Sequence, residues 1–405
     1  MSILRKGYFL GPILGAAWML ICSITLTIFI SFAIGHPLMP NLFILFLLGA
    51  FSGVIFIYNQ NKLTSWLLVL VTTFILVIAG YSPITLMEYR DEAAINLLIN
   101  LVTILVLGLA LTLTLKNTPF SILSRYEFES CLIRFLTGFG YIFFTIIVMI
   151  PFYLMIMTSL KNQSELLLNP LDFSIDFTKG FTLFRSYFEL FTEYNFGSYL
   201  WTSFFVSILT VLITLVFAIP GAYAVARLQF KGRAIFSRSI LLIYMVPMIV
   251  LALPIYIGFS VLGIRNSIFG IVLIYPVTTI PVALYMLQGY FRSLPAEVEE
   301  AGLMDGLSRL SVIWKITLPL SIPALVSVSL YVFMIAWNEF LIAFMLLDDP
   351  SKFTLTRGIA MLDSSEIPRQ HLMAGSVIAT VPILAIFLGL EKYMTKGLAS
   401  GSVKG

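Results

Sequence analysis

Few residues of this 405-residue chain have the types and spacing that catalysis or metal binding needs. The two histidines, His36 and His371, are too few and too far apart for a zinc site, and Cys22 and Cys131 suggest neither a disulfide framework nor a metal cluster. The sequence also lacks a Gly-x-x-x-x-Gly-Lys-Ser/Thr run that could cradle nucleotide phosphates. We therefore expect no catalytic residue, no metal and no cofactor in this chain.

Glu339 is an acidic residue that hydropathy places within an apolar span. Burial of a carboxylate in a membrane costs a few kcal/mol, so such a residue is a functional hypothesis by default. On that hypothesis Glu339, with its neighbours Trp337 and Asn338, lies near a solute path or a gate. The alternative is a structural carboxylate that is satisfied by Asn338 or by a neighbouring helix.

The composition indicates that these residues lie in a membrane. Hydrophobic residues make up 60% of the chain and charged residues 11%, and the mean hydropathy is +1.01, whereas a soluble domain carries about 25% charged residues. The apolar runs are long and continuous, as in helices, whereas strands of a membrane barrel alternate. We predict an all-α polytopic membrane protein. The net charge of +4 is spread along the loops and gives no support to nucleic-acid binding.

Hydropathy predicts about ten membrane-spanning helices. Arg5 and Lys6 precede the first, as in a cleaved signal peptide, but the apolar core of a signal peptide is usually about 7–15 residues long. Here the run extends to about Ile34, so we expect a retained helix. The predicted spans are 10–34, 42–58, 66–81, 94–115, 138–160, 199–226, 235–262, 268–288, 322–347 and 373–394.

The positions of lysine and arginine predict the orientation of these spans, because cytoplasmic loops carry an excess of both. With the N-terminus in the cytoplasm, most of the 24 basic residues fall in cytoplasmic segments. Both termini then face the cytoplasm, and the long loops 161–198 and 348–372 lie outside.

The segment 292–319, between the eighth and ninth predicted spans, has the pattern of two short helices joined by a turn. Pro295 suits a first helical turn, and Glu299 favours the positive end of the helix dipole. Gly306 can adopt the left-handed conformation that ends a helix, and Ser308 can cap the next one. A short amphipathic unit of this kind can insert into a groove on a partner. The alternative is an amphipathic connector without a partner.

This segment resembles the cytoplasmic Glu-Ala-Ala loop of the permease subunits of bacterial ABC importers, the binding-protein-dependent transport inner-membrane components. The residues that match at the family spacing are Glu300, Ala301, Gly306, Ile316, Leu318 and Pro319. Gly302 stands where a second alanine is usual, which costs roughly 1 kcal/mol of helix propensity. The resemblance implies that these residues, together with Glu299 and Asp305, form an ATPase-coupling loop.

Further segments resemble carbohydrate permeases, in particular the six-span maltose permease subunit. Trp337-Asn338-Glu339-Phe340 is similar to a sequence frequent in them, and segments 353–358 and 397–405 are similar to the last outer loop and the C-terminus of that subunit. The resemblance begins near Phe135. It implies an accessory region of about four helices at 1–117, a cytoplasmic linker at 118–134 and a six-helix permease domain at 135–405.

The resemblance also implies partners and a location. The chain is expected to form half of a translocation pathway with a second permease, in a bacterial-type plasma (inner) membrane. Two copies of a cytoplasmic ABC ATPase hydrolyse ATP, and an extracytoplasmic solute-binding protein delivers a sugar such as maltose, maltodextrin or a related oligosaccharide. Another solute, such as a glycerol phosphate or a polyol, is an alternative within this class. An ion-coupled secondary transporter is the alternative outside it, although such proteins often show paired charges inside their spans.

The outer loop 348–372 corresponds to the loop that, in maltose-type permeases, reaches into the open binding protein. Its polar side chains suit a probe that competes with the sugar for hydrogen bonds, and a solvated connector is the alternative. The residues expected to contact the binding protein are Asp363, Ser364, Ser365, Glu366, Arg369 and Gln370.

Overall fold

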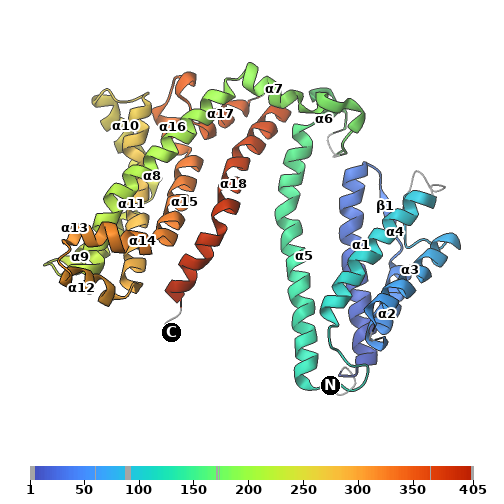
Figure 1. Ribbon diagram of the computed structural model, residues 1–405. Coiled ribbons are helices and arrows are strands. Elements are labelled where there is room, and N and C mark those ends of the chain that lie inside the picture. Colours follow the sequence, from blue (N-terminus) through green and yellow to red (C-terminus); the bar gives the residue numbers. More distant parts are fainter. Residues whose placement is uncertain are drawn as a thin grey trace. The chain divides into compact units, whose positions relative to one another are not determined.

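The chain folds into two compact units, Met1–Gly180 and Phe181–Gly405 (Figure 1). The computed structural model describes residues 5–59, 61–86, 93–169, 172, 174–364 and 366–402. Ser365, one of the residues expected to contact a binding protein, lies outside this part of the chain, as do the last three residues of the segment 397–405.

The first unit is helical apart from one short antiparallel strand pair in its described part. Strand β1 (Leu38–Pro40) pairs with β2 (Ile84–Leu86), so that Leu38 lies opposite Leu86. Its helices are α1 (Gly7–Ile34), α2 (Leu42–Tyr58), α3 (Lys62–Ile78), α4 (Ala93–Thr114), α5 (Arg125–Ser159) and α6 (Gln163–Leu168). Helix α1 packs on α2 and α4, and α3 packs on α4.

Helices α1 and α2 approach closely through glycines. Each helix has a Gly-x-x-x-Gly sequence, Gly11 to Gly15 in α1 and Gly49 to Gly53 in α2. A Cβ atom on Gly11 would lie 2.8 Å from the carbonyl oxygen of Gly53, and one on Gly15 would overlap the carbonyl oxygen of Gly49. Small residues at such crossings allow two backbones to pack directly against each other in a membrane.

Buried polar side chains of α4 fix the strand pair and α1. The side-chain oxygen of Asn100 accepts a hydrogen bond from the backbone of Ile84 (3.1 Å), and that of Asn96 accepts one from Leu86 (3.0 Å). Near the other end of α4, the indole of Trp18 donates to the Thr114 hydroxyl (2.9 Å). The first unit therefore has its own apolar core, in which the side chains of Asn96, Asn100 and Trp18 are hydrogen-bonded.

The second unit is built around α8, which packs against α11 and α15, while α15 also packs on α18. Figure 1 shows α9, α12 and α13 gathered at one end of this unit, with α16 and α17 at the other. Its elements include η1 (Phe177–Phe184), which begins before the boundary, α7 (Arg185–Thr192), α8 (Phe196–Arg227), α9 (Arg233–Tyr244), α10 (Met248–Val261), α11 (Ile268–Ser293), α12 (Ala296–Met304), α13 (Arg309–Val312), η2 (Ile313–Thr317), α14 (Leu318–Leu320), α15 (Ile322–Asn338), α16 (Leu341–Leu346), η3 (Pro350–Lys352), α17 (Leu355–Leu362) and α18 (Arg369–Ser402).

The all-α polytopic prediction is confirmed, but the predicted spans do not all correspond to single long helices. In the described residues, six helices are long and apolar enough to cross a membrane, or seven if one bent pair counts as a span. Helices α2 and α3 have 17 residues each, which rise about 26 Å and lie at the lower limit for a span.

Two predicted spans are interrupted. The span 235–262 divides into α9 and α10, and α10 begins after Pro247, which lacks the N–H group that a continuous helix would use. The span 322–347 divides into α15 and α16 at Glu339 and Phe340. Hydropathy averaged over a whole span does not reveal these breaks, because the runs on both sides of each break are apolar.

Helix α5 begins earlier than the predicted span at 138. Ser124 caps its first turn, and the Glu127 side chain bonds back to the Ser124 backbone (2.8 Å), which together make a capping box. Residues 125–134, predicted as part of a linker, are therefore helical. The predicted domain boundary near 135 rests on the family resemblance and stays a prediction, whereas α5 lies within the compact unit Met1–Gly180.

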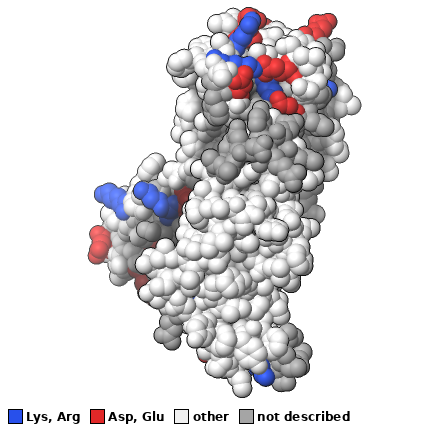
Figure 2. All heavy atoms as spheres, turned by 90° about the vertical axis from the view of Figure 1, so that its right-hand side faces the viewer, with Lys and Arg blue, Asp and Glu red and all other residues white. Residues whose placement is uncertain are grey.

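Exposed apolar side chains cover many of these helices, and a membrane can solvate them. Figure 2 shows, on the face turned to the viewer, broad areas of uncharged side chains, with lysine, arginine, aspartate and glutamate gathered in small groups.

Candidate functional site

The segment 292–319 forms two short helical pieces joined by a tight turn, as predicted. Helix α12 contains the first piece, and α13, η2 and α14 together form the second. The second piece continues through Pro319 to Leu320. At Ser321 the chain bends by 79° into α15.

Gly306 ends α12 in the conformation that the sequence predicts. Its φ angle is +86°, in the left-handed region that glycine adopts without a steric penalty. The backbone N–H of Leu307 donates to the carbonyl of Gly302, and that of Gly306 donates to Leu303, both over 3.1 Å. These two bonds make a Schellman motif, which satisfies carbonyls at the end of the helix. Ser308 then caps α13 by accepting a hydrogen bond from the backbone of Ser311 (3.3 Å).

Glu299 anchors this segment to α8. Its side chain is 8% exposed, and its carboxylate forms an ion pair with Arg227 Nε at 3.3 Å. The carboxylate also accepts hydrogen bonds from the Tyr223 hydroxyl (3.2 Å) and from the Thr317 hydroxyl (3.0 Å). Arg227 in turn donates to the carbonyl of Leu294 (2.7 Å), just before α12. One buried carboxylate therefore ties both helical pieces to the end of α8.

Gly302 allows the two pieces to lie close together. A Cβ atom at this position would meet the Cδ1 atom of Ile316 at 2.5 Å. Both residues belong to the pattern that resembles the family motif, and the structure brings them into contact. An alanine at 302 would require the end of the Ile316 side chain to move.

The opposite surface of the segment is exposed and apolar. Met304 is 88% exposed, Leu310 70% and Trp314 71%. The acidic residues Glu300 and Asp305 are also exposed. Exposed apolar side chains on a fixed base are typical of a surface that docks onto a partner.

Two members of this anchor, Tyr223 and Arg227, belong to no motif that the sequence shows. Both lie on α8, far from Glu299 along the chain, and no motif spacing connects them. The one available signal is Arg227 itself, a basic residue at the C-terminal end of a long apolar helix, where a positive charge interacts favourably with the helix dipole. That signal does not reveal its acidic partner.

The residues predicted near a path or gate surround the break between α15 and α16. The Glu339 carboxylate accepts hydrogen bonds from the backbone N–H groups of Ile342 (2.8 Å) and Ala343 (3.1 Å), so it caps the start of α16. Trp337 is buried and donates from its indole to the carbonyl of Ala379 in α18 (3.1 Å). The Asn338 side chain is exposed. The bonds of Glu339 fit the structural alternative, with backbone groups as its partners.

The polar residues of the outer segment separate into exposed and buried groups. Asp363, Ser364, Glu366 and Arg369 are exposed, whereas Gln370 is buried.

The neighbouring His371 ring contacts the Glu189 carboxylate on α7 at 2.7 Å. Arg185 donates to the same carboxylate (2.6 Å), and this hydrogen bond holds the pKa of Glu189 below its ordinary value, although partial burial acts in the opposite direction. His371 acts in the same direction as Arg185 and joins the start of α18 to α7.

Comparison with known proteins assigns this chain to a family. The family model of the binding-protein-dependent transport system inner membrane component matches residues 218–399, which include the whole segment 292–319. The inner membrane ABC transporter permease protein YcjP of Escherichia coli K12 is 35% identical over 270 residues, which cover 66% of this chain and 95% of that protein. The chain therefore belongs to the family of binding-protein-dependent transport system inner membrane components and is a multi-pass membrane protein.

The names of other relatives refer to sugar transport. The trehalose/maltose transport system permease protein MalG of Thermococcus litoralis is 34% identical and covers 68% of this chain and 99% of its own length. The trehalose transport system permease protein SugB of Mycobacterium tuberculosis is 34% identical over 225 residues, or 55% of this chain and 82% of that protein. Sugar permeases of ABC importers are thus among the proteins that this chain resembles.

A solved structure has the same fold as part of the chain. A crystal structure of a bacterial ABC transporter involved in the import of the acidic polysaccharide alginate contains a chain that aligns with a TM-score of 0.57 at 23% identity. The alignment covers 68% of this chain and 99% of the other.

Proposed function

We propose that this chain is a non-catalytic permease subunit of a binding-protein-dependent ABC importer for a sugar. It forms half of the translocation pathway with a second permease subunit and receives a cytoplasmic ABC ATPase on the segment 292–319. Both termini face the cytoplasm, in agreement with the excess of lysine and arginine in the segments assigned to that side.

One observation supports this proposal above all: the segment 292–319 is anchored to α8 on one side and exposes apolar side chains on the other. The buried Glu299 carboxylate holds the base through Arg227, Tyr223 and Thr317. Met304 and Trp314 offer apolar surface on the exposed side. A partner that binds there can exert force on α8 and α15, because the segment is attached to both.

Co-purification tests the ATPase partner. The tagged full-length chain, purified from its native membrane in mild detergent, is expected to retain an ABC ATPase that mass spectrometry identifies. Trp314→Glu places a charge in the docking surface and should remove the ATPase, whereas Trp314→Phe keeps an apolar ring and should retain it. Equal retention by both variants would show that the ATPase, if present, binds elsewhere.

A disaccharide or short oligosaccharide is the solute class that we propose, with maltose and maltodextrin as its first members. The support is the sugar names of several relatives, including the diacetylchitobiose uptake permease of Streptomyces coelicolor. Binding of labelled sugars, glycerol phosphate and polyols to the cognate solute-binding protein tests this proposal. Uptake in vesicles that contain the whole importer must then show the same preference.

The exposed part of the outer segment is proposed to contact that binding protein. Asp363, Ser364 and Glu366 are exposed and polar, which suits competition for sugar hydroxyls. Gln370 contributes less, because its side chain is buried. Replacement of residues 363–366 with a glycine-serine linker of equal length should reduce receptor-stimulated transport while basal ATP hydrolysis by the assembled importer remains. Unchanged receptor-dependent uptake would make this segment a connector.

A further inference from the structure

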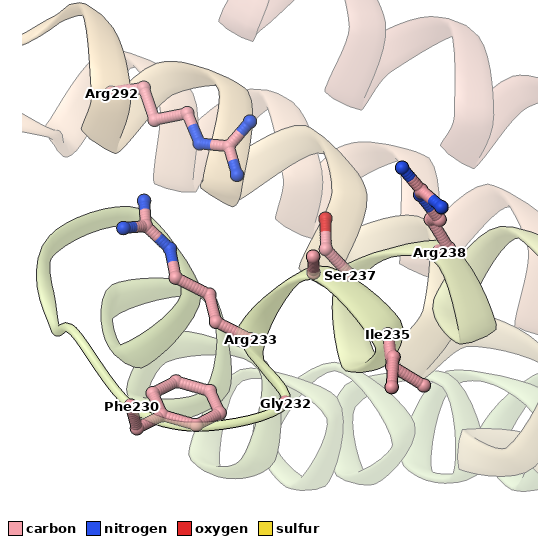
Figure 3. A pocket seen from close by; sticks show the side chains of 8 residues that line it. Phe230, Gly232, Arg233, Ile235, Ser237, Arg238 and Arg292 are labelled. Atoms are coloured by element: carbon pink, nitrogen blue, oxygen red, sulfur yellow. The ribbon is translucent and has the colours of Figure 1, made fainter.

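A cavity with an arginine-rich lining lies beside the segment 292–319. Its volume is about 600 Å³, and its lining includes Arg233 and Arg238 of α9 and Arg292 near the end of α11. Figure 3 shows that the side chains of Arg233 and Arg292 extend toward each other across this cavity. Among the described residues that line it, none is acidic.

The three arginines differ in how firmly the protein holds them. Arg233 donates from Nε to the carbonyl of Val225 (2.7 Å) and from a terminal nitrogen to that of Ala226 (3.1 Å), so it is fixed to the end of α8. Arg238 and Arg292 are exposed, and the described part of the chain supplies neither with an ion pair. Their charges are therefore available to a ligand.

Gln288 positions Arg292. Its side-chain amide lies between the Ser237 hydroxyl and the Arg292 guanidinium. In the orientation that satisfies both neighbours, the amide oxygen accepts from Arg292 at 3.0 Å, and the amide nitrogen donates to Ser237 at 3.3 Å. The contact ties α9 to α11 and engages one side of the guanidinium.

The chemistry of this cavity fits a phosphoryl group. Guanidinium groups bind phosphate oxygens through paired N–H groups, and three of them without an acid nearby leave an excess of positive charge. The excess favours an anion over a neutral ligand.

Apolar side chains at the same place favour a lipid over a free phosphate. Phe230 and Ile235 line the cavity and are 42% and 73% exposed, and the next residue along α9, Phe236, is 46% exposed. A soluble anion gains nothing from this apolar surface, whereas acyl chains of a phospholipid do. Basic pockets among transmembrane helices are sites of this kind for anionic headgroups.

We propose that this cavity binds the headgroup phosphate of an anionic phospholipid between Arg233, Arg238 and Arg292, with the acyl chains along Ile235 and Phe236. The site goes beyond the proposed transport function and does not depend on it, because a phospholipid is present whichever solute is carried. Since Arg292 is the first residue of the segment 292–319, a lipid bound here contacts the start of that segment.

Lipid titration of the purified full-length chain tests this proposal. The chain, stripped of lipid in neutral detergent, is titrated with phosphatidylglycerol or phosphatidylcholine, and bound lipid is measured by native mass spectrometry. We expect saturable binding of phosphatidylglycerol and weak binding of phosphatidylcholine. Arg238→Gln should weaken the binding of phosphatidylglycerol about fivefold, the effect of one basic residue beside an anionic lipid. Arg238→Lys should weaken it less.

Lys231→Gln is the matched control. It changes the net charge by the same amount in the turn just before α9, and Lys231 is exposed but does not line the cavity. Phosphatidylglycerol binding by this variant should equal that of the unchanged chain. Equal losses in Lys231→Gln and Arg238→Gln would overturn the proposal in favour of diffuse attraction to a basic surface.

Two further outcomes would also overturn it. If inorganic phosphate alone displaces phosphatidylglycerol from the chain at millimolar concentration, the site takes a free anion. If Arg238→Gln removes the co-purifying ATPase but leaves phosphatidylglycerol binding unchanged, the cavity is a protein interface. Because Arg238 is exposed, its variants are expected to fold, and an unchanged melting temperature checks this.

Discussion

Arg227 Nε lies 3.3 Å from a carboxylate oxygen of Glu299, although α9, α10 and α11 separate the two residues along the chain. Both side chains are largely shielded from solvent, so the pair is screened little by salt. The contact is the point at which a long apolar helix meets the candidate coupling segment. If the contact between Arg227 and Glu299 is broken, we expect the exposed surface around Trp314 to lose its fixed position.

Removal of the charge on Glu299 should therefore loosen the segment. In Glu299→Gln, Arg227 loses its acidic partner in a largely buried position, and we expect the free energy of unfolding to fall by about 1.5–3 kcal/mol. Glu300→Gln makes the same change of charge on an exposed neighbour and should leave the free energy of unfolding unchanged. Unfolding of the purified chain in detergent measures both, and equal stability of the two variants would contradict the anchoring role.

The turn at Gly306 gives a second prediction. With φ at +86°, this position costs a residue with a Cβ atom about 1–2 kcal/mol, and a β-branched residue more. Gly306→Val should insert into the membrane but lose the co-purifying ATPase. Asparagine tolerates the left-handed region, so Gly306→Asn should retain more of the ATPase. The assignment of the coupling segment fails if Gly306→Val transports normally.

The contact of Glu189 with Arg185 and His371 predicts a pH dependence. Because the hydrogen bond from Arg185 lowers the pKa of Glu189 in the folded chain, the carboxylate stabilises the fold above its unfolded pKa of about 4.3. This contribution is lost as the pH falls through the lower, folded pKa. The difference in melting temperature between the unchanged chain and Glu189→Gln should thus be present near neutral pH and shrink in acid. Glu193→Gln, an exposed neighbour, serves as the control. A difference that grows in acid would reverse the assigned sign.

Orientation can be measured by cysteine labelling. The two native cysteines are each 1% exposed, so they should give a low background. A cysteine in place of Ser311 should react with an impermeant maleimide from the cytoplasmic side, and one in place of Ser364 from the outside. Reaction of both from one side would mean that the number of crossings between them is even.

The glycine contact between α1 and α2 predicts a strong steric effect. Gly15→Leu places a large side chain against the backbone around Gly49, and overpacking of this kind typically costs about 1–3 kcal/mol. Gly140→Leu in α5 adds the same atoms where nothing lies within 4 Å and should be tolerated. Unfolding of both variants with a denaturing detergent compares them, and similar midpoints would argue against a close crossing.

Local chemistry made part of this fold predictable from the sequence. The end of α12 at Gly306 and the start of α13 after Ser308 depend on the backbone conformation of one residue and on one side-chain oxygen, and both are visible in the sequence. The predicted span 42–58 coincides with α2, because its apolar run ends where asparagines flank it.

Long-range contacts were not predictable in the same way. The partners of Glu299 lie on α8, and no periodicity relates positions so far apart in the chain. Hydropathy also missed the break between α15 and α16 at Glu339. There the Glu339 carboxylate accepts hydrogen bonds from the backbone N–H groups of Ile342 and Ala343, and hydropathy contains no information about such bonds. One acidic residue in an apolar run signals that something is unusual there, but does not identify its partners.

The glycine crossing also has a consequence for the order in which the protein is made. Helices α1 and α2 follow each other in the chain, so their contact requires nothing synthesised after Tyr58. The bond from Trp18 to Thr114 must wait for the end of α4. Because chains emerge from the ribosome with the N-terminus first, the α1–α2 hairpin can close before α4 has been inserted. The α1–α2 hairpin of the first unit can thus fold in a nascent chain before residues 218–399, which match the family model, have been translated.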